Sequence, residues 1–141
     1  NLVLEPVTEE APPRTLRPET WTAPSHAWAS VTPLVLDRFT HDDDEKRALV
    51  ALACERVGLP RPSDVRLSHV SPHCGVPPSP RFGPLPVSGD RPARPFTHAI
   101  LTFAREDGSP LAVRGPVLIG AGRFRGYGLF RPFRNSQCPR S

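Results

Sequence analysis

Proline sets the strongest limit on what this chain can fold into. The 141 residues include 20 prolines, and proline lacks the N–H that helix interiors and central strands require. The prolines gather in two stretches, residues 1–25 and residues 72–95, and neither stretch is expected to form a long regular element. Regular secondary structure is therefore expected between these stretches and after the second one.

The most clearly predicted element is a helix that follows the acidic cluster "HDDDE", His41 to Glu45. The aspartates supply an N-cap, and acid in the first turn complements the helix dipole. Gly58 is a natural stop, with proline two residues beyond it. The apolar residues expected to repeat at helical spacing are Leu49, Leu52, Ala53 and Val57.

Apolar alternation predicts strands on both sides of this helix. Residues 26–39 predict a strand that is broken or bulged at Pro33, and residues 64–71 predict a second strand. Residues 96–105 alternate most clearly, and the sequence "YGLFRPF" at residues 127–133 predicts a closing strand.

The order of these elements is close to the βαββαβ order of a ferredoxin-like, RRM-like fold of the α+β class. The second helix of that order is expected to be shortened around "GPVLIGAG", residues 115–122. Residues 26–134 are expected to form this domain, with a long proline-rich loop at 72–95. Residues 1–25 are expected to be a linker or the end of an upstream unit, and residues 135–141 a basic tail.

Charge is distributed unevenly along the chain. The formal net charge is +4, yet no acidic residue follows Asp107, while six arginines do. A basic end with a separate acidic cluster predicts an oriented surface that attracts polyanions. The alternative is a solvated arginine tail.

No apolar run is long enough to span a bilayer, so a soluble protein without membrane partners is expected. The three cysteines are far apart and show no CxxC spacing, so a disulfide framework is not expected and the reducing cytoplasm is the expected compartment. The chain begins at Asn1 and contains no methionine. It is therefore expected to be processed or to be a piece of a longer polypeptide.

The stretch "GPVLIGAGRFRGYGLFRP" combines glycine, arginine and aromatic residues. It has neither the spacing of the dinucleotide fingerprint nor the G-K-[ST] of a P-loop. Amides exposed by glycine can form a nest for phosphate oxygens, arginine adds charge-assisted bonds, and an exposed ring can stack a base. A structural hairpin is the alternative. The residues predicted to contact RNA are Gly120, Gly122, Arg123, Phe124, Arg125, Gly126, Gly128 and Arg131.

Two sequences in this region, "HAILTF" at 98–103 and "GPVLIGAGRFRGYGLF" at 115–130, resemble the carboxy-terminal signature of the RAMP superfamily, the RNA-binding proteins of CRISPR systems. Upstream, "WASVTPLVLDRF" and "ACERVGLPRP" resemble more narrowly the fused Cas-five/Cas-six protein of subtype I-G (formerly I-U). The resemblance implies a ferredoxin-like fold and binding of CRISPR repeat RNA. Other effector subunits and the upstream part of the same polypeptide are the further partners it implies.

For the Cas-six part, the resemblance also implies metal-independent cleavage of repeat RNA. The 2′-hydroxyl beside the scissile phosphate attacks, leaving a 2′,3′-cyclic phosphate and a 5′-hydroxyl. This chain would be the carboxy-terminal unit of such an endoribonuclease. The alternative is a non-catalytic subunit that caps the CRISPR-RNA handle in an effector complex.

Cleavage of this kind needs acid–base groups that titrate near neutrality, which histidine provides. His26 and then His98 are the candidates, although His98 can instead be a core histidine with satisfied hydrogen bonds. Tyr127 can stack a base, align a hydroxyl or be buried. No metal site or cofactor is expected, because His69, His73 and Cys74 do not complete a tetrahedral set.

Overall fold

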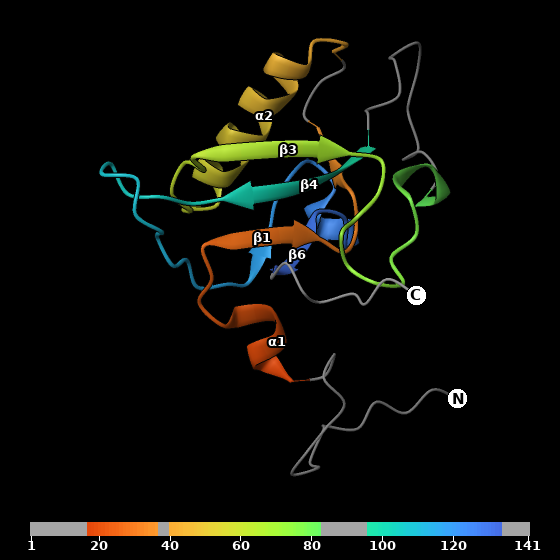
Figure 1. Ribbon diagram of the computed structural model, residues 1–141. Coiled ribbons are helices and arrows are strands. Elements are labelled where there is room, and N and C mark those ends of the chain that lie inside the picture. Colours follow the sequence, from red (N-terminus) through yellow and green to blue (C-terminus); the bar gives the residue numbers. More distant parts are fainter. Residues whose placement is uncertain (1–16, 37–39, 83–95, 134–141) are drawn as a thin grey trace.

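The computed structural model describes residues 17–36, 40–82 and 96–133. Most of the predicted linker, the second half of the proline-rich loop and the basic tail lie outside the described residues. The described chain is an α+β structure in which a curled antiparallel sheet carries one main helix (Figure 1). Its elements are α1 (Pro18–Thr22), β1 (Ala27–Ser30), β2 (Leu34–Val35), α2 (Asp43–Arg56), β3 (Asp64–Ser68), η2 (Ser79–Phe82), β4 (Phe96–Thr102), β5 (Val117–Leu118), η3 (Arg123–Arg125) and β6 (Leu129–Pro132).

Strand β4 is the central strand of the sheet. It pairs with β3 on one edge and with β1 and β2 on the other, while β6 lies beyond β1 and β5 beyond β6. Every pairing is antiparallel. Strands β1 and β3 therefore run in the same direction on either side of β4, and α2 lies between them in the chain.

Strands β1 and β2 are one strand interrupted by a bulge. Ala29 pairs with Ile100 and Leu34 pairs with Thr97, so the four residues 30–33 lie opposite only two residues of β4. Pro33 cannot donate to a ladder, which favours a bulge at this point. The prediction of a strand bulged at Pro33 is confirmed.

The predicted helix is confirmed as α2, but its buried face differs from the prediction. Asp42 caps the helix by accepting a hydrogen bond from the amide of Asp44, and Gly58 follows with φ +85°. Leu52 and Val57, two of the residues expected in the core, are each 39% exposed. The residues that α2 buries are Val50, Ala51, Ala53 and Cys54. Small side chains at these positions let the helix pack closely on the sheet.

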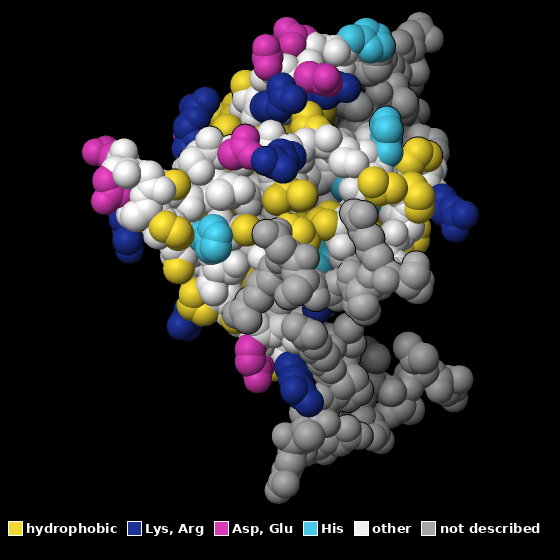
Figure 2. All heavy atoms as spheres, viewed as in Figure 1, with side chains coloured by type: hydrophobic (Ala, Val, Ile, Leu, Met, Phe, Trp, Pro, Cys, Tyr) yellow, Lys and Arg dark blue, Asp and Glu magenta, His cyan; other side chains and the backbone are white. Residues whose placement is uncertain are grey.

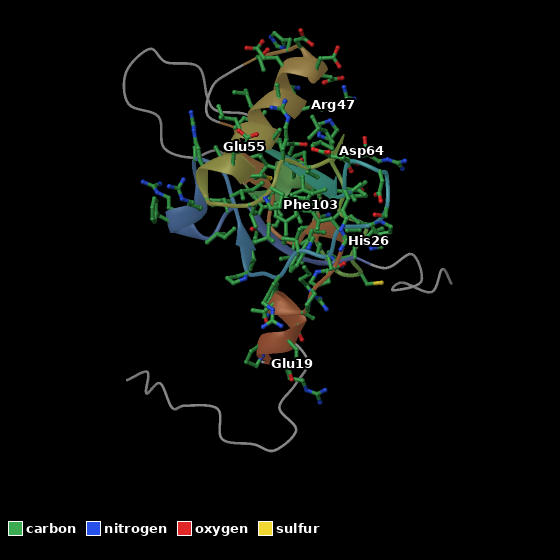
Figure 3. The ribbon with its side chains drawn as sticks, turned by 90° about the vertical axis from the view of Figure 1, so that its left-hand side faces the viewer. Glu19, His26, Arg47, Glu55, Asp64 and Phe103 are labelled. Atoms are coloured by element: carbon green, nitrogen blue, oxygen red, sulfur yellow. The ribbon has the colours of Figure 1, made fainter. Side chains whose placement is uncertain are left out.

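The hydrophobic core lies between α2 and the sheet and extends to β5 and β6. Phe103, labelled in Figure 3, follows β4 and is fully buried. The predicted closing strand is confirmed as β6; from its alternation Leu129 would be expected to face the core, but the buried residue is Phe130, and Leu129 is only partly buried. The largest fully buried apolar side chains include Trp28, Phe103, Phe130, Leu34 and Leu101.

Two departures from the prediction affect the region around β6. Residues 103–128 are all described and contain no α-helix; β5 and η3 occur where a shortened second helix was expected. The short helix α1 forms within the predicted linker and packs against β6. The side chain of Arg131 lies over the ring of Trp21, 5.5 Å from its centroid.

Candidate nucleic-acid interface

The glycine-rich stretch docks its backbone onto the bulge between β1 and β2. The amide of Ala121 donates to the carbonyl of Val35, and the amide of Gly128 donates to the carbonyl of Pro33. Other amides that donate within the protein are those of Ile119, Arg123, Arg125, Gly126, Tyr127 and Leu129. Most amides of the stretch therefore donate to acceptors within the protein, and these amides do not form the expected phosphate nest.

The glycines in this stretch permit close packing. Gly128 has φ +80°, and a Cβ there would lie 1.8 Å from the carbonyl oxygen of Ile119. Gly120 has φ +100°, and its Cβ would lie 2.8 Å from the carbonyl oxygen of Val35. Only glycine combines this backbone conformation with such close contact. Gly120, Gly122 and Gly128 are buried, and only Gly126 is exposed.

The side chains of η3 remain at the surface, and we call them the Arg-Phe-Arg tip (Arg123–Arg125). Phe124 is 87% exposed. The guanidinium of Arg123 lies over the Phe124 ring, 4.6 Å from its centroid, and donates to the carbonyl of Gly120 at 3.2 Å. Neither Arg123 nor Arg125 forms an ion pair with any residue that the structure describes. The tip thus offers two guanidinium groups and an aromatic face to solvent.

Acidic side chains gather elsewhere. Asp43, Asp44 and Glu45 lie in the first turn of α2, and the acidic residues near the top of Figure 2 cover this end of the helix. Lys46 and Arg47 pair with Asp43 and Asp44 at 3.7 and 2.9 Å. The cations of this helix are therefore partly neutralised, unlike those of the tip.

The structure places His26 far from the tip. His26 is exposed and directly precedes β1, whereas the tip docks beyond the other end of that strand. Five residues of extended chain separate His26 from Val31, about 16 Å. In Figure 3, the labelled His26 and the blue turn of η3 lie on opposite sides of the molecule. The two predicted elements of the site are not brought together.

His98 is a buried histidine with both ring nitrogens in hydrogen bonds. Its Nε2 lies 3.0 Å from the carbonyl oxygen of Pro77, and its Nδ1 lies 2.8 Å from Oγ of Ser30. Because a carbonyl only accepts, the proton is on Nε2, and the Ser30 hydroxyl donates to Nδ1. Burial lowers the pKa of His98, partly offset by the bond to Pro77. This arrangement matches the core-histidine alternative and keeps the ring neutral near pH 7.

Tyr127 lies against the same loop as His98. Its hydroxyl donates to the carbonyl of Phe82 at 3.3 Å, and its ring lies 5.1 Å from that of Phe96. Phe82 contacts the rings of both His98 and Tyr127, at 5.9 and 6.5 Å. The structure thus brings these two predicted residues together around Phe82, as anchors for the segment that contains η2.

Sequence reasoning missed the residues that complete this anchoring. His73, which the sequence offered for an incomplete metal set, is buried, and its Nε2 donates to the carbonyl of Ala29 at 3.0 Å. The hydroxyl of Ser71 donates to the carbonyl of Ser30. No local pattern marks a serine or histidine in an irregular segment as a partner for a distant strand, so sequence spacing could not have identified them.

Arg131, the last residue of the predicted RNA-contacting set, lies on β6 opposite Ala29 and over Trp21. It belongs to the sheet next to α1 and not to the tip. Among the described residues, no three His, Cys, Asp or Glu side chains are grouped so that they could hold a metal ion. In the same part of the chain, none of the helices has the length and apolar character needed to traverse a bilayer.

Comparison with known proteins places this chain in a family. No curated protein and no solved structure matches it. One family model matches residues 14–132, which is most of the chain and includes α1, the whole sheet and the tip. The chain belongs to the CRISPR-associated protein, GSU0054 family (Cas_GSU0054).

Proposed function

We propose that this chain is an RNA-binding unit of a CRISPR system and that the Arg-Phe-Arg tip is its contact with CRISPR repeat RNA. The observation that carries this proposal is the exposure of Phe124 and Arg125, together with the lack of any ion pair from Arg123 or Arg125 to a described residue. Family membership places the chain in a CRISPR system. We therefore propose CRISPR RNA as the polyanion that it binds and other effector subunits as its protein partners.

The chemistry of the tip suits a single RNA strand. Guanidinium groups bond phosphate oxygens in a fork geometry, and an exposed ring such as Phe124 stacks an unpaired base with a contribution of about 1–3 kcal/mol. Arg123 and Phe124 are already stacked on each other, so part of the ordering cost is met before RNA arrives. The backbone on either side of the tip is held by hydrogen bonds from Ala121 to Val35 and from Gly128 to Pro33.

The topology supports a ferredoxin-like unit spanning residues 26–134. Strands β1 and β3 flank β4 and are connected through α2, which is the split βαβ arrangement of that fold. Strand β6 joins the sheet next to β1, as the fourth strand of βαββαβ. The proposed unit lacks the second helix, whose place is taken by β5 and η3.

We further propose that the whole protein is a Cas-five/Cas-six fusion of subtype I-G and that it processes repeat RNA without metal in the cytoplasm. His26 is the exposed acid–base candidate in this unit, but RNA bound at the tip would have to run the length of β1 to reach it. His98 and Tyr127 support the fold in this arrangement. The proposal therefore assigns this unit to gripping RNA and lets the upstream part of the polypeptide complete the catalytic site. A non-catalytic cap on the RNA handle is the second candidate, favoured by the distance between His26 and the tip.

Replacing Arg123 and Arg125 together with glutamine tests the RNA contact. The matched control replaces Arg61 and Arg105, two exposed arginines outside the tip, so that both variants lose the same charge. Binding of labelled repeat RNA is measured by filter retention across a salt series. The tip variant is expected to reduce the slope of log K against log salt by about 1.4, the value for two lost phosphate contacts on a single strand. Equal slopes for the two variants would exclude the tip as the contact.

Cleavage distinguishes the enzyme from the cap. The polypeptide with its upstream part is incubated with labelled repeat RNA in a chelator. A product ending in a 2′,3′-cyclic phosphate supports the endoribonuclease, whereas binding without cleavage supports the cap.

A further inference from the structure

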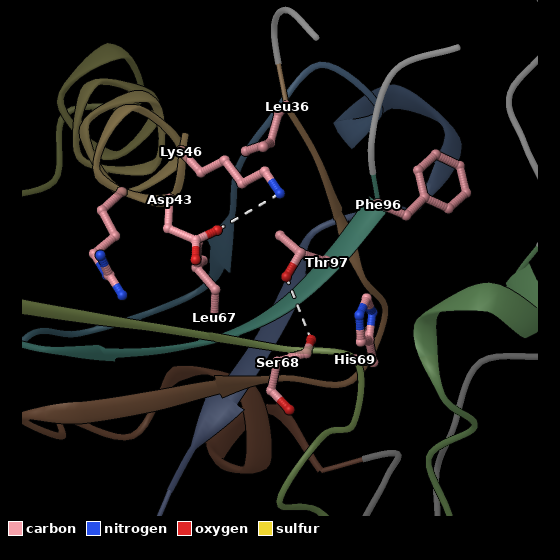
Figure 4. Close-up of a pocket in the computed structure, with 9 residues that line it drawn as sticks. Leu36, Asp43, Lys46, Leu67, Ser68, His69, Phe96 and Thr97 are labelled. Atoms are coloured by element: carbon pink, nitrogen blue, oxygen red, sulfur yellow. Dashed lines mark hydrogen bonds and ion pairs between the residues drawn. The ribbon is translucent and has the colours of Figure 1, made fainter. Parts of the chain in front are cut away.

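A hollow in the surface lies outside the Arg-Phe-Arg tip. The hollow, of about 230 Å³, lies between the first turns of α2 and the ends of β2, β3 and β4 (Figure 4). Its apolar walls are Leu36 and Leu67, and Phe96 lies at its edge with the ring turned away toward Tyr127. This volume is below the roughly 300–1,000 Å³ of sites for drug-sized ligands, so the hollow suits one small group.

Polar groups converge on the same hollow. Lys46, the chain's single lysine, extends across it toward Thr97 in Figure 4, and its side chain is only 26% exposed. Its ammonium lies 3.7 Å from the Asp43 carboxylate, a long contact that leaves further N–H donors available. The hydroxyl of Thr97 bonds backbone carbonyls beside the opening. The ammonium of Lys46, a donor, therefore lies next to the carboxylate of Asp43, an acceptor, at a hollow whose walls are apolar.

A nucleobase has the complementary form. Each base combines a flat apolar face with an edge on which a hydrogen-bond acceptor adjoins a donor. RNA-binding proteins read single strands by taking unstacked bases against apolar and aromatic side chains and bonding their edges. A free phosphate fits less well, because Asp43 lies beside Lys46 and Arg47 already bonds Asp44.

The hollow is also connected to the Arg-Phe-Arg tip. Phe96, at its edge, packs its ring against Tyr127, which directly follows Gly126 at the end of η3. Leu36, on a wall of the hollow, follows Val35, whose carbonyl accepts from Ala121 on the approach to the tip. The hollow and the tip therefore meet at the edge of the sheet formed by β2 and the start of β4, with Leu36 on the face that α2 covers and Tyr127 on the other face. An RNA strand bound at the tip would have to pass around this edge to reach the hollow.

We infer that this hollow is a base-binding subsite for one unstacked nucleotide of the RNA strand that the tip holds. Lys46 donates to the acceptor on the base edge, Asp43 accepts from the neighbouring donor, and Leu36 with Leu67 contacts the base face. The inference rests on the proposed function, since it gives the same RNA a second point of contact.

The test compares RNA with and without bases. Fluorescein-labelled oligonucleotides of about ten nucleotides, homopolymers of A, C and U and an abasic ribose-phosphate strand, are titrated by anisotropy. Variants Lys46→Gln and Thr97→Val are compared with Arg56→Gln, which removes the same charge from the last turn of α2, outside the hollow. A strand containing 4-thiouridine is crosslinked in parallel, and the modified peptide is identified by mass spectrometry.

We expect at least one homopolymer to bind about tenfold more tightly than the abasic strand, and this preference to fall in Lys46→Gln but not in Arg56→Gln. Crosslinks to the peptide around Phe96 are expected in the wild type. RNA binding with no base preference, or with a preference unchanged in both hollow variants and no crosslink at Phe96, would overturn the subsite alone. Absence of any RNA binding would overturn the proposed function as well. Thermal unfolding of each variant separates lost binding from lost folding.

Discussion

The glycine-rich stretch, residues 115–128, and the proline-rich segment, residues 71–82, are both irregular, yet they are held in opposite ways. In the glycine stretch, backbone amides donate to a neighbouring strand, and the side chains of Arg123 to Arg125 are left outside. In the proline segment, side chains make the bonds to the sheet. His98 of β4 donates to the carbonyl of Pro77, while Ser71 and His73 of the segment donate to carbonyls of β1.

The difference follows from what each residue type can offer. Glycine lets a backbone approach another backbone closely, so its amides find partners directly. Proline has no amide to donate, so a proline-rich segment is held by side-chain donors, which lie both on the segment and on the sheet. The glycine stretch therefore leaves the Arg-Phe-Arg tip on the surface. The proline segment instead accepts hydrogen bonds from His98 and Tyr127, two side chains that the sequence offered as catalytic candidates.

The largest effect is expected where the glycine backbone is most crowded. Gly128→Ala places a Cβ against the Ile119 carbonyl at positive φ, whereas Gly126→Ala at a similar φ meets nothing within 4 Å. We expect the free energy of unfolding to fall by about 3 kcal/mol or more for Gly128→Ala and by about 1 kcal/mol for Gly126→Ala. Urea denaturation measures both. Similar losses would mean that backbone conformation, and not close contact, explains these glycines.

The next effect concerns the side chains that hold the proline segment. His98→Leu leaves the Pro77 carbonyl and the Ser30 hydroxyl without their partner, and we expect a loss of about 2–4 kcal/mol. His69→Leu, at an exposed position outside that network, is the control and is expected to change stability by about 0.5 kcal/mol or less. If the two variants unfold at the same urea concentration, the buried hydrogen bonds of His98 do not stabilise the fold.

The same histidine predicts a pH dependence. The folded state holds the pKa of His98 below its ordinary value of 6.5, so below pH 6.5 the unfolded state binds more protons and stability falls. This contribution is fully present above pH 6.5 and is lost as the pH drops toward the folded-state pKa. We expect the wild type to lose more stability than His98→Leu between pH 7.5 and pH 5. Parallel pH profiles for the two proteins would refute the role of His98.

The smallest effect joins the two regions. Tyr127→Phe removes the single hydroxyl bond to the Phe82 carbonyl while keeping the ring contacts. We expect a loss of about 1 kcal/mol or less and unchanged RNA affinity. A large drop in RNA binding with normal stability would instead give the hydroxyl a direct role with RNA.

Local patterns in the sequence determined most of the secondary structure. The aspartates before α2 and Gly58 after it set the helix ends, since capping depends on neighbouring residues only. Alternation in β4 placed Ala99, Leu101 and Phe103 on one face, and all three are buried. Pro33 marked the bulge. The exposure of Phe124 also followed from its place among glycines and arginines.

Tertiary structure decided which polar groups remain available for function. His98 and His26 look alike in the sequence, yet one is fixed between Ser30 and Pro77 and the other is exposed, because that depends on segments up to 68 residues apart. Two amides of the glycine stretch, those of Ala121 and Gly128, donate to the carbonyls of Val35 and Pro33. The hollow beside Lys46 exists only where α2 meets the sheet. Hydrogen-bond partners and cavities arise from contacts distant in the chain, and no local spacing encodes them.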